Sequence, residues 1–353
     1  MNVVHTTVLS SLSSMIEVDG SHLEGGGQIL RTAVALSAIT GKPAHIYNIR
    51  KGRDRPGLKP QHLHGIVAAG RICSAEIDGL EMNSPEVTFF PGQTEGGTFD
   101  VDTKTAGSVT LILQTLVPIG IHADSPLEFV IKGGTAVPFS PPIGYFSHVF
   151  IPILRTVGAT LDVDVRRHGF YPRGGGVVRA KIEPSDISPL MMRERGEVKD
   201  IKVWIHAARH LKGALVAERM LAGFAGVVKD AKAQCSYVDA VSPGCFMTAR
   251  ARFDNGIVGS SALGKRGKPA EQIGIEAASE LKTAIDSGAA VDNWMVDQLI
   301  PYMAMATHRT GESSQVRVPS LTEHAQTNIW VVEKFMPVSF NIQDGVLLCR
   351  NVV

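Results

Sequence analysis

Residues able to handle phosphate chemistry occur at three places in this sequence, and the first is a glycine-rich stretch. Residues 24–31 read EGGGQILR, which places three glycines between an acid and an apolar run. Glycine adopts backbone angles closed to other residues and lets a ligand approach the main chain. The N–H groups that begin a following helix lack internal partners and attract anions. The stretch therefore suggests a phosphate-facing turn, although most glycine clusters are turns without a ligand.

The second place is a basic loop over residues 50–61. It contains Arg50, Lys51, Arg53, Arg55 and Lys59. Guanidinium groups hold phosphate through two parallel hydrogen bonds, so the three arginines could hold the end of a nucleic acid. A solvated basic loop on the surface is the competing interpretation.

The third place is His324, which lies just before an expected helix over residues 329–335. Thr327 or Asn328 would be the residue that caps this helix. A neutral imidazole near a helix N-terminus can attack an electrophilic phosphorus while the helix end stabilises the phosphate. The chain has 12 histidines, however, and a structural or surface role is the commoner one for a histidine.

Two further positions could contact a nucleotide. On an expected helix over residues 292–307, Trp294 offers a flat surface for a base and Asp297 an acceptor for a hydroxyl or imidazole. One core aromatic and one exposed acid would explain the same pattern without a ligand. Gln114 lies in an apolar helix and would need a partner if it is buried. An exposed glutamine is the simpler explanation.

Common nucleotide and metal motifs are absent from the sequence. No Gly-Lys-Ser/Thr follows the glycines, their spacing is not G-x-G-x-x-G, and no H-E-x-x-H occurs. Reasoning from the residues alone therefore reaches an α/β protein with candidate phosphate sites and does not name a reaction.

The elements that must position these residues alternate between strand and helix patterns. Strands are expected at 15–20, 44–49, 99–102, 127–131, 160–165 and 177–182, with helices at 29–39, 61–73 and 109–116 and a helix that ends at Val157. This alternation indicates an α/β architecture of stacked, similar units.

The pattern changes after residue 185. Residues 186–198 are polar and resemble a linker, and residues 201–205, 214–229, 244–253 and 270–286 suggest a compact βαβα module. We therefore predict a large domain over 15–185 and 288–353, interrupted by a small α/β domain over 186–287. Residues 1–14 are predicted to be a poorly ordered extension.

Composition limits the setting and the partners. The 353 residues are 44% hydrophobic and carry 35 Lys and Arg against 34 Asp and Glu, so any nucleic-acid contact must come from a local basic patch. The four cysteines are scattered without a C-x-x-C pair, which argues against a disulfide scaffold or zinc site and fits a reducing compartment. No apolar run could cross a bilayer and no signal peptide is evident. These features predict a cytoplasmic protein with no membrane partner.

Taken together, the motifs resemble the RNA 3′-terminal phosphate cyclase family. The resemblance extends from about Met15 to Phe340 and rests on EGGGQILRT at 24–32, Ile49-Arg50 with Arg53, PGL at 56–58 with Gln61-His62, TAGS at 105–108 with Gln114, HGFYP at 168–172 before GGG at 174–176, and Thr327-Asn328 with EKF at 333–335. Several motifs in the family's order are more specific than any one of them.

This resemblance implies a large domain of three repeated units, each a sheet packed on two helices as in enolpyruvyl transferases, with the smaller domain inserted in the third unit. It also implies conversion of an RNA 3′-phosphate to a 2′,3′-cyclic phosphate with ATP and a divalent metal, Mg²⁺ or Mn²⁺. A covalent histidine–AMP would form and then pass AMP to the RNA 3′-phosphate. The neighbouring 2′-hydroxyl would close the ring and expel AMP, a step that DNA could not complete.

The resemblance also assigns roles to residues. His324 would be the catalytic histidine, and Glu24 would help to bind the metal. The RNA phosphate would be held by Arg31, Arg50, Arg53 and Gln61. The ATP site would be lined by Gln114, Pro141, Trp294, Met295, Val296, Asp297 and Gln298, with the base between Pro141 and Trp294. The family commonly has tyrosine where Trp294 stands.

Two other classes of protein compete with this interpretation. Eukaryotic relatives assist ribosome assembly without the catalytic histidine, so a binding protein is one alternative. An enolpyruvyl-type transferase would share the fold unit but not the setting of His324, and the fold alone would not separate these classes. The predicted partners are RNA with a 3′-terminal phosphate and ATP, and a homodimer is left open.

Overall fold

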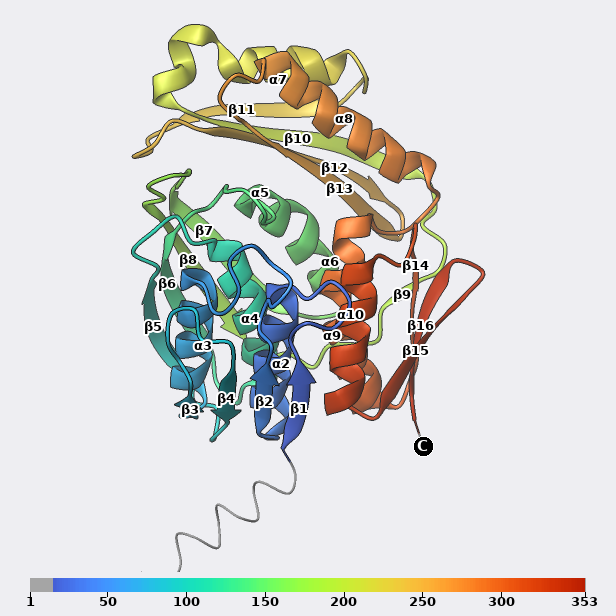
Figure 1. Ribbon diagram of the computed structural model, residues 1–353. Helices are drawn as coiled ribbons and strands as arrows, with labels where there is room; N and C mark the ends of the chain where they lie inside the picture. Colours follow the sequence, from blue (N-terminus) through green and yellow to red (C-terminus); the bar gives the residue numbers. More distant parts are fainter. Residues whose placement is uncertain (1–14, 353) are drawn as a thin grey trace, which may run out of the picture.

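The computed structural model describes residues 15–352, so the extension predicted for residues 1–14 lies outside the described part of the chain. The described residues form four four-stranded sheets. Three of these sheets surround a central group of helices, and the fourth lies above them under two further helices (Figure 1). No helix among residues 15–352 is both long and apolar enough to span a bilayer.

The three lower sheets belong to three repeats with the same order of elements. The first repeat consists of β1 (Ile16–Asp19), α2 (Gly27–Thr40), β2 (Ala44–Tyr47), α3 (Pro60–Ile72), β3 (Glu76–Asp78) and β4 (Val87–Phe90). The second consists of β5 (Gly97–Asp102), α4 (Val109–His122), β6 (Leu127–Gly133), a helical segment of α5 (Ile143–Tyr145), η1 (Phe146–Phe150) and α6 (Ile151–Thr156), then β7 (Thr160–Arg167) and β8 (Gly176–Glu183). The third consists of β9 (Met191–Met192), α9 (Asn293–Thr310), β14 (Ser314–Arg317), α10 (Glu323–Phe335), β15 (Val338–Gln343) and β16 (Val346–Asn351).

Strand pairing is also the same in each repeat. The first strand pairs in parallel with the second, the second pairs antiparallel with the fourth, and the fourth pairs antiparallel with the third. A parallel pair needs a crossover, which the first helix of each repeat supplies. The structure therefore confirms the predicted α/β fold of three repeated sheet-plus-two-helix units.

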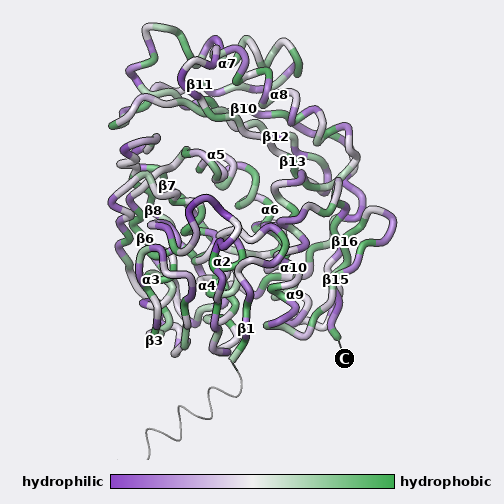
Figure 2. Tube along the Cα trace, in the orientation of Figure 1, coloured by the Kyte–Doolittle hydropathy of each residue, from purple (hydrophilic) through white to green (hydrophobic). Residues whose placement is uncertain are grey.

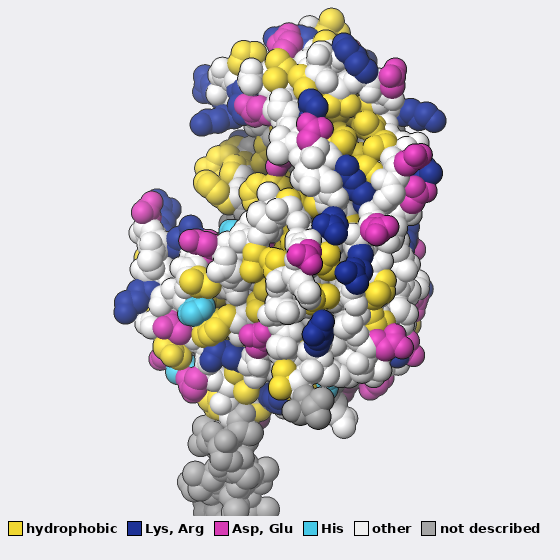
Figure 3. Space-filling view, turned by 90° about the vertical axis from the view of Figure 1, so that its right-hand side faces the viewer, with side chains coloured by type: hydrophobic (Ala, Val, Ile, Leu, Met, Phe, Trp, Pro, Cys, Tyr) yellow, Lys and Arg dark blue, Asp and Glu magenta, His cyan; other side chains and the backbone are white. Residues whose placement is uncertain are grey.

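A smaller unit is inserted in the third repeat between β9 and α9, and we call it the inserted domain. It consists of β10 (Val198–Ala208), η2 (Arg209–Ala214), α7 (Val216–Ala225), β11 (Lys232–Val238), β12 (Cys245–Phe253), β13 (Gly256–Leu263) and α8 (Ala270–Asp286). Val203, Ile205, Phe224, Met247 and Leu281 are among the residues of its own hydrophobic cluster, separate from that of the repeats. Viewed from the side of the third repeat, a recess lined partly by hydrophobic side chains separates the inserted domain from the repeats (Figure 3).

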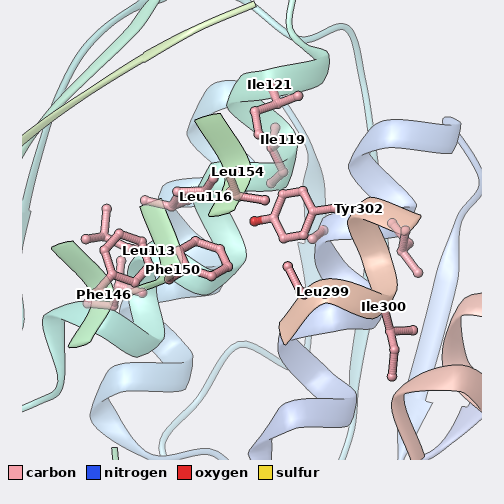
Figure 4. Close-up of a cluster of buried hydrophobic side chains, with 14 of the residues drawn as sticks. Leu113, Leu116, Ile119, Ile121, Phe146, Phe150, Leu154, Leu299, Ile300 and Tyr302 are labelled. Carbon is pink, nitrogen blue, oxygen red and sulfur yellow. The ribbon is translucent and has the colours of Figure 1, made fainter. Parts of the chain in front are cut away.

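The repeats share one core around their central helices. Helix α2 packs against α3, α4 and α10, and α10 packs against α9. Leu113 and Leu116 of α4 lie beside Phe150 of η1 and Tyr302 of α9, so the second and third repeats interlock through apolar side chains (Figure 4). The basic loop, in contrast, forms a hydrophilic stretch near the upper end of α2 (Figure 2).

Several expected boundaries differ from the structure. The range 186–198 is not only a linker, because Met191 and Met192 form β9 and pair with β14, so the inserted domain begins after β9. Helix α4 continues past Pro118 to His122, where tertiary packing outweighs the loss of one backbone hydrogen bond. Strands β3, β4, β11, β13, β14, β15 and β16 were not expected. Of these, β3, β4 and β14 have only three or four residues, too few for a long alternating pattern, and they depend on their neighbours for pairing.

Candidate active site

The starts of α2, α9 and α10, from the first and third repeats, hold His324 and its hydrogen-bonded partners. Helix α2 begins after the glycine-rich turn, in which Gly25 has φ +60° and Gly26 caps the helix. A Cβ atom at Gly26 would lie 2.0 Å from Glu24 Oε2, and one at Gly27 would lie 2.2 Å from His62 Nε2. The glycines therefore leave room for two polar side chains to pack directly against the start of the helix.

His324 lies in the first turn of α10, not before it. The helix starts at Glu323 and is capped by Thr322, whose hydroxyl accepts a hydrogen bond from the Ala325 N–H at 3.1 Å. The prediction that Thr327 or Asn328 caps this helix is wrong, because the polar residues before the apolar run are already helical. Asn328 instead accepts from Thr32 at 2.6 Å and donates to the carbonyl of Asp297 at 2.6 Å.

The imidazole of His324 has one nitrogen fixed and the other available. Its Nδ1 lies 2.7 Å from Oε1 of Gln28, while Nε2 of Gln28 donates to Oδ2 of Asp297 at 2.8 Å. Because the carboxylate fixes the orientation of the amide, Nδ1 must carry the proton. Nε2 of His324 then keeps its lone pair and lies 3.7 Å from Oε1 of Glu24.

The surroundings of His324 favour the neutral form of its imidazole. Burial lowers the pKa of His324, and the nearby positive charges of Arg31 and Arg53 lower it further. An uncharged, oriented imidazole at a helix N-terminus is the form that can act as a nucleophile toward phosphorus.

Arg31 and Asp297, two ionisable side chains near His324, affect each other's pKa. Burial raises the pKa of Asp297 to about 7, against the opposing effect of Arg31. Burial lowers the pKa of Arg31 to about 10, against the opposing effect of Asp297. Asp297 therefore changes charge near neutral pH, whereas Arg31 stays cationic.

A pocket adjoins these groups. Its polar wall includes Gln28, Arg31, Gln114, Asp297 and Gln298. Gln114 donates to Oε1 of Gln298 at 3.0 Å, so the glutamine within the apolar helix α4 has a polar partner on α9. Gln114, Asp297 and Gln298 were predicted for the nucleotide site and are far apart in the sequence, and they line one pocket.

The other positions predicted for the nucleotide site differ in their setting. Trp294 is 60% exposed, whereas Met295 and Val296 are buried in the core, so only their backbone could face a ligand. Pro141 is half-buried, and its carbonyl accepts from the hydroxyl of Thr110 at 2.7 Å.

Of the four predicted phosphate-binding residues, Arg31 lies on α2, and the other three lie along the basic loop and at its end. Arg53 forms an ion pair with Glu24 and also donates to the Glu24 carbonyl at 3.2 Å. Arg50 has φ +55° and donates to the carbonyl of Arg55 at 2.7 Å. Gln61 lies in the first turn of α3. Arg53 and Glu24 are therefore already beside His324, while Arg50 is held by its own loop.

His62 is a site residue to which the sequence analysis gave no role. It packs against Gly27, and its Nδ1 accepts from the N–H of Lys59 at 3.3 Å. Burial, with Arg31, Arg50 and Lys59 nearby, lowers its pKa to about 3, so this histidine stays neutral. The sequence feature that could have identified His62 as a site residue is its position directly after Pro60 and Gln61, at the start of a helix.

Glu24 is the residue that could accept a metal ion. Its Oε2 is buried and lacks a hydrogen-bond partner, an arrangement that a cation would satisfy. Mg²⁺ commonly binds one or two carboxylates together with substrate phosphates, so a single protein carboxylate fits that ion. Among residues 15–352, no three His, Cys, Asp or Glu side chains gather to form a metal site by themselves.

Comparisons with known proteins agree on one family. The model of the family described as RNA 3′-terminal phosphate cyclase matches residues 22–342. Curated proteins named RNA 3′-terminal phosphate cyclase include one from Methanopyrus kandleri, 43% identical over 94% of this chain and 96% of its own, and one from Methanosarcina barkeri, 44% identical over 93% and 97%. The solved enolpyruvyl transferase NikO from Streptomyces tendae aligns with 47% of this chain and 33% of its own at 15% identity and a TM-score of 0.27, too weak a likeness to carry an argument.

Proposed function

The chain belongs to the RNA 3′-terminal phosphate cyclase family, and we propose on that premise that it converts an RNA 3′-terminal phosphate to a 2′,3′-cyclic phosphodiester with ATP, through a covalent histidine–AMP. It would thus be a ligase-class enzyme of RNA end processing. The observation that carries the proposal is the pair of contacts of His324. Gln28 holds Nδ1, and Nε2 remains free beside Glu24.

In the first step, Nε2 of His324 attacks the α-phosphorus of ATP. A P–N bond forms, the bond from the α-phosphorus to the bridging oxygen breaks, and diphosphate leaves. The imidazole becomes positively charged as it reacts. Oε1 of Gln28 accepts a hydrogen bond from its Nδ1–H and so stabilises that charge. Asp297 keeps Gln28 in the required orientation.

The next two steps use the RNA. An oxygen of the 3′-phosphate attacks the phosphorus of the histidine–AMP, which frees the imidazole and gives a diphosphate-linked RNA end. The 2′-hydroxyl then attacks the RNA phosphorus, a proton is lost, and AMP leaves as the ring closes. Positioning and charge neutralisation govern such reactions, which suits the cluster of Arg31, Arg50, Arg53 and Gln61 as the RNA-phosphate site.

A divalent ion would be held by Glu24. When bound, it would neutralise charge on the phosphates of ATP. Binding of the ion to Glu24 would replace its ion pair with Arg53, so the Arg53 guanidinium would become available to the RNA phosphate. Gln114, Asp297 and Gln298 of the pocket would contact the nucleotide, and its base would lie between Pro141 and Trp294.

The four cysteines are free, three of them buried, which fits a reducing compartment and supports a cytoplasmic location. The homodimer stays a prediction.

The decisive test is formation of a protein–AMP adduct. The protein is incubated with ATP labelled at the α-phosphate and then denatured. We expect an acid-labile, base-stable adduct in the wild type and none in His324→Ala. His308→Ala, which changes an exposed histidine in the last turn of α9, is the matched control and should keep the adduct.

A wild type that forms no adduct and does not cyclise a 3′-phosphorylated RNA would refute the proposal. Retention of RNA binding in that case would favour the binding-protein class. An adduct that persists in His324→Ala would instead place the nucleophile elsewhere.

A further inference from the structure

The start of α9 is attached to the inserted domain as well as to the repeats. Asp292 caps this helix by accepting from the N–H groups of Trp294 and Met295 at 3.0 and 3.1 Å. The same carboxylate accepts from the Gly259 N–H of β13 at 2.7 Å and from the Tyr145 hydroxyl of the second repeat at 2.6 Å. One side chain therefore joins the inserted domain, the second repeat and the third.

A second contact from the inserted domain reaches the side chain of Trp294. The indole N–H, the only polar group of that ring, donates to Oε1 of Glu280 on α8. Glu280 is itself half-buried, and it is held by the backbone of Ser261 on β13. On the other side, Gln298 Nε2 donates to the Trp294 carbonyl at 2.7 Å while its Oε1 accepts from Gln114. Trp294 thus lies between the nucleotide pocket and the inserted domain.

An exposed tryptophan without such a contact would sample several rotamers. Fixing its two side-chain dihedrals before a ligand arrives lowers the entropy that binding must offset. A hydrogen bond to an ionised acceptor is stronger than a neutral one, which makes a carboxylate an effective holder of the indole.

We propose that Glu280 of the inserted domain is a positioning residue for Trp294, holding the indole as the wall on which the nucleotide base stacks. The inference rests on the proposed function, because Trp294 is assigned to the base there. It gives the inserted domain a role in ATP affinity, whereas the covalent step remains with the repeats.

The chain offers a matched control on the same helix. Glu276 lies one turn before Glu280 on α8, but its carboxylate pairs with Lys268 within the inserted domain. Glu276→Gln therefore removes a charge and an ion pair from the same helix without touching Trp294. Glu280→Ala removes the acceptor for the indole, and Glu280→Gln keeps an acceptor oxygen of similar reach.

The first experiment uses iodide quenching of tryptophan fluorescence in the absence of ATP. The ring of Trp204 stacks on His148 and that of Trp330 on His22, with centroids 3.8 and 4.0 Å apart, and both tryptophans are half-buried. Quenching by iodide therefore reports mainly on Trp294. We expect altered quenching in Glu280→Ala, with Glu280→Gln and Glu276→Gln close to the wild type. Unchanged quenching in Glu280→Ala would overturn the inference.

The second experiment is a double-mutant cycle on the adenylylation step. Loss of a charge-assisted hydrogen bond at a half-exposed position should raise the KM for ATP about fivefold to tenfold, with kcat within about twofold. Glu280→Gln should restore most of the affinity. In a Trp294→Phe background, which lacks the indole N–H, Glu280→Ala should have no further effect.

An equal effect of Glu280→Ala in both backgrounds would show that Glu280 acts independently of Trp294 and would contradict the inference. Failure of the proposed function would look different, because the wild type itself would then form no adduct. The quenching experiment still decides the position of the indole in that case.

Discussion

His324 and a cluster of three other histidines, His148, His168 and His206, all have lowered pKa values, and of these four only His324 is placed to react. His324 lies at a helix N-terminus with one nitrogen fixed by Gln28 and the other free. His148, His168 and His206 instead lie where the inserted domain meets the second repeat. His148 stacks on Trp204 with ring centroids 3.8 Å apart, and His168 and His206 lie 4.6 Å apart.

The difference shows that a lowered pKa does not identify a nucleophile. Burial lowers the pKa of His168 to about 3 and those of His148 and His206 to about 4. Nδ1 of His206 is buried without a partner, and Nδ1 of His168 lies beside the Thr135 hydroxyl. Reactivity needs in addition an orienting partner, access for the substrate and groups that stabilise the phosphate.

The comparison is tested most strongly at Gln28. Gln28→Leu keeps the size of the side chain but removes the acceptor for His324 Nδ1, so the imidazole can adopt the wrong tautomer or orientation. We expect the rate of adduct formation to fall about a hundredfold, measured by single-turnover labelling. Gln326→Leu on α10, which removes an exposed amide, should stay near the wild type. A full rate in Gln28→Leu would mean that His324 needs no orienting partner.

The next largest effect concerns pH and Asp297. The pKa of Asp297 is about 7, so its carboxylate is ionised above that pH and protonated below it. Protonation removes the acceptor that fixes Gln28, so adenylylation should decline about tenfold between pH 8 and pH 6. The pKa of His324 is itself lowered by burial and by Arg31 and Arg53, so its protonation is shifted toward lower pH than that of an ordinary histidine.

Asp297→Asn distinguishes titration of Asp297 from titration of His324 in that experiment. Its side-chain oxygen accepts from Gln28 at every pH, so the decline below neutral pH should disappear, at a somewhat lower rate above pH 7. Persistence of the same decline in Asp297→Asn would assign it to another group. The measurement is the rate of adduct formation across the pH range with saturating ATP.

The smallest effect belongs to the buried histidines and concerns stability. Their pKa values in the folded chain lie below the ordinary value of 6.5. Between pH 6.5 and 4 the unfolded chain therefore binds protons that the folded chain does not. The free energy of unfolding should therefore decrease as the pH is lowered through this range, by at most about 1.4 kcal/mol per pH unit for each histidine.

His206→Gln should reduce the pH dependence of the free energy of unfolding by up to the contribution of one histidine. The variant should still form the protein–AMP adduct, in contrast to His324→Ala. Denaturant unfolding at several pH values measures the pH dependence. An unchanged slope in His206→Gln would show that His206 is not one of the groups responsible.

The alternation of strand and helix patterns in the first half of the sequence indicated stacked, similar units, and the resemblance to the family supplied their number of three. The sequence did not indicate β9, since two residues show no periodicity and depend on β14 for pairing. His324 was identified through its resemblance to a family motif, but the first turn of α10 was missed because its residues are polar. The partners of His324 and Trp294 come from other elements of the fold, so no local pattern could reveal Gln28 or Glu280.

The position of the inserted domain also sets an order of assembly. The first two repeats are complete in the chain before β9, whereas β9 at Met191 must pair with Gln315 of β14, beyond the whole inserted domain. A folded inserted domain brings these two segments closer than a disordered chain of the same length would. During synthesis, the third repeat can close only after the inserted domain has emerged, and α9 and α10 close with it. Catalytic competence would therefore be acquired only after the first two repeats and the inserted domain have been made.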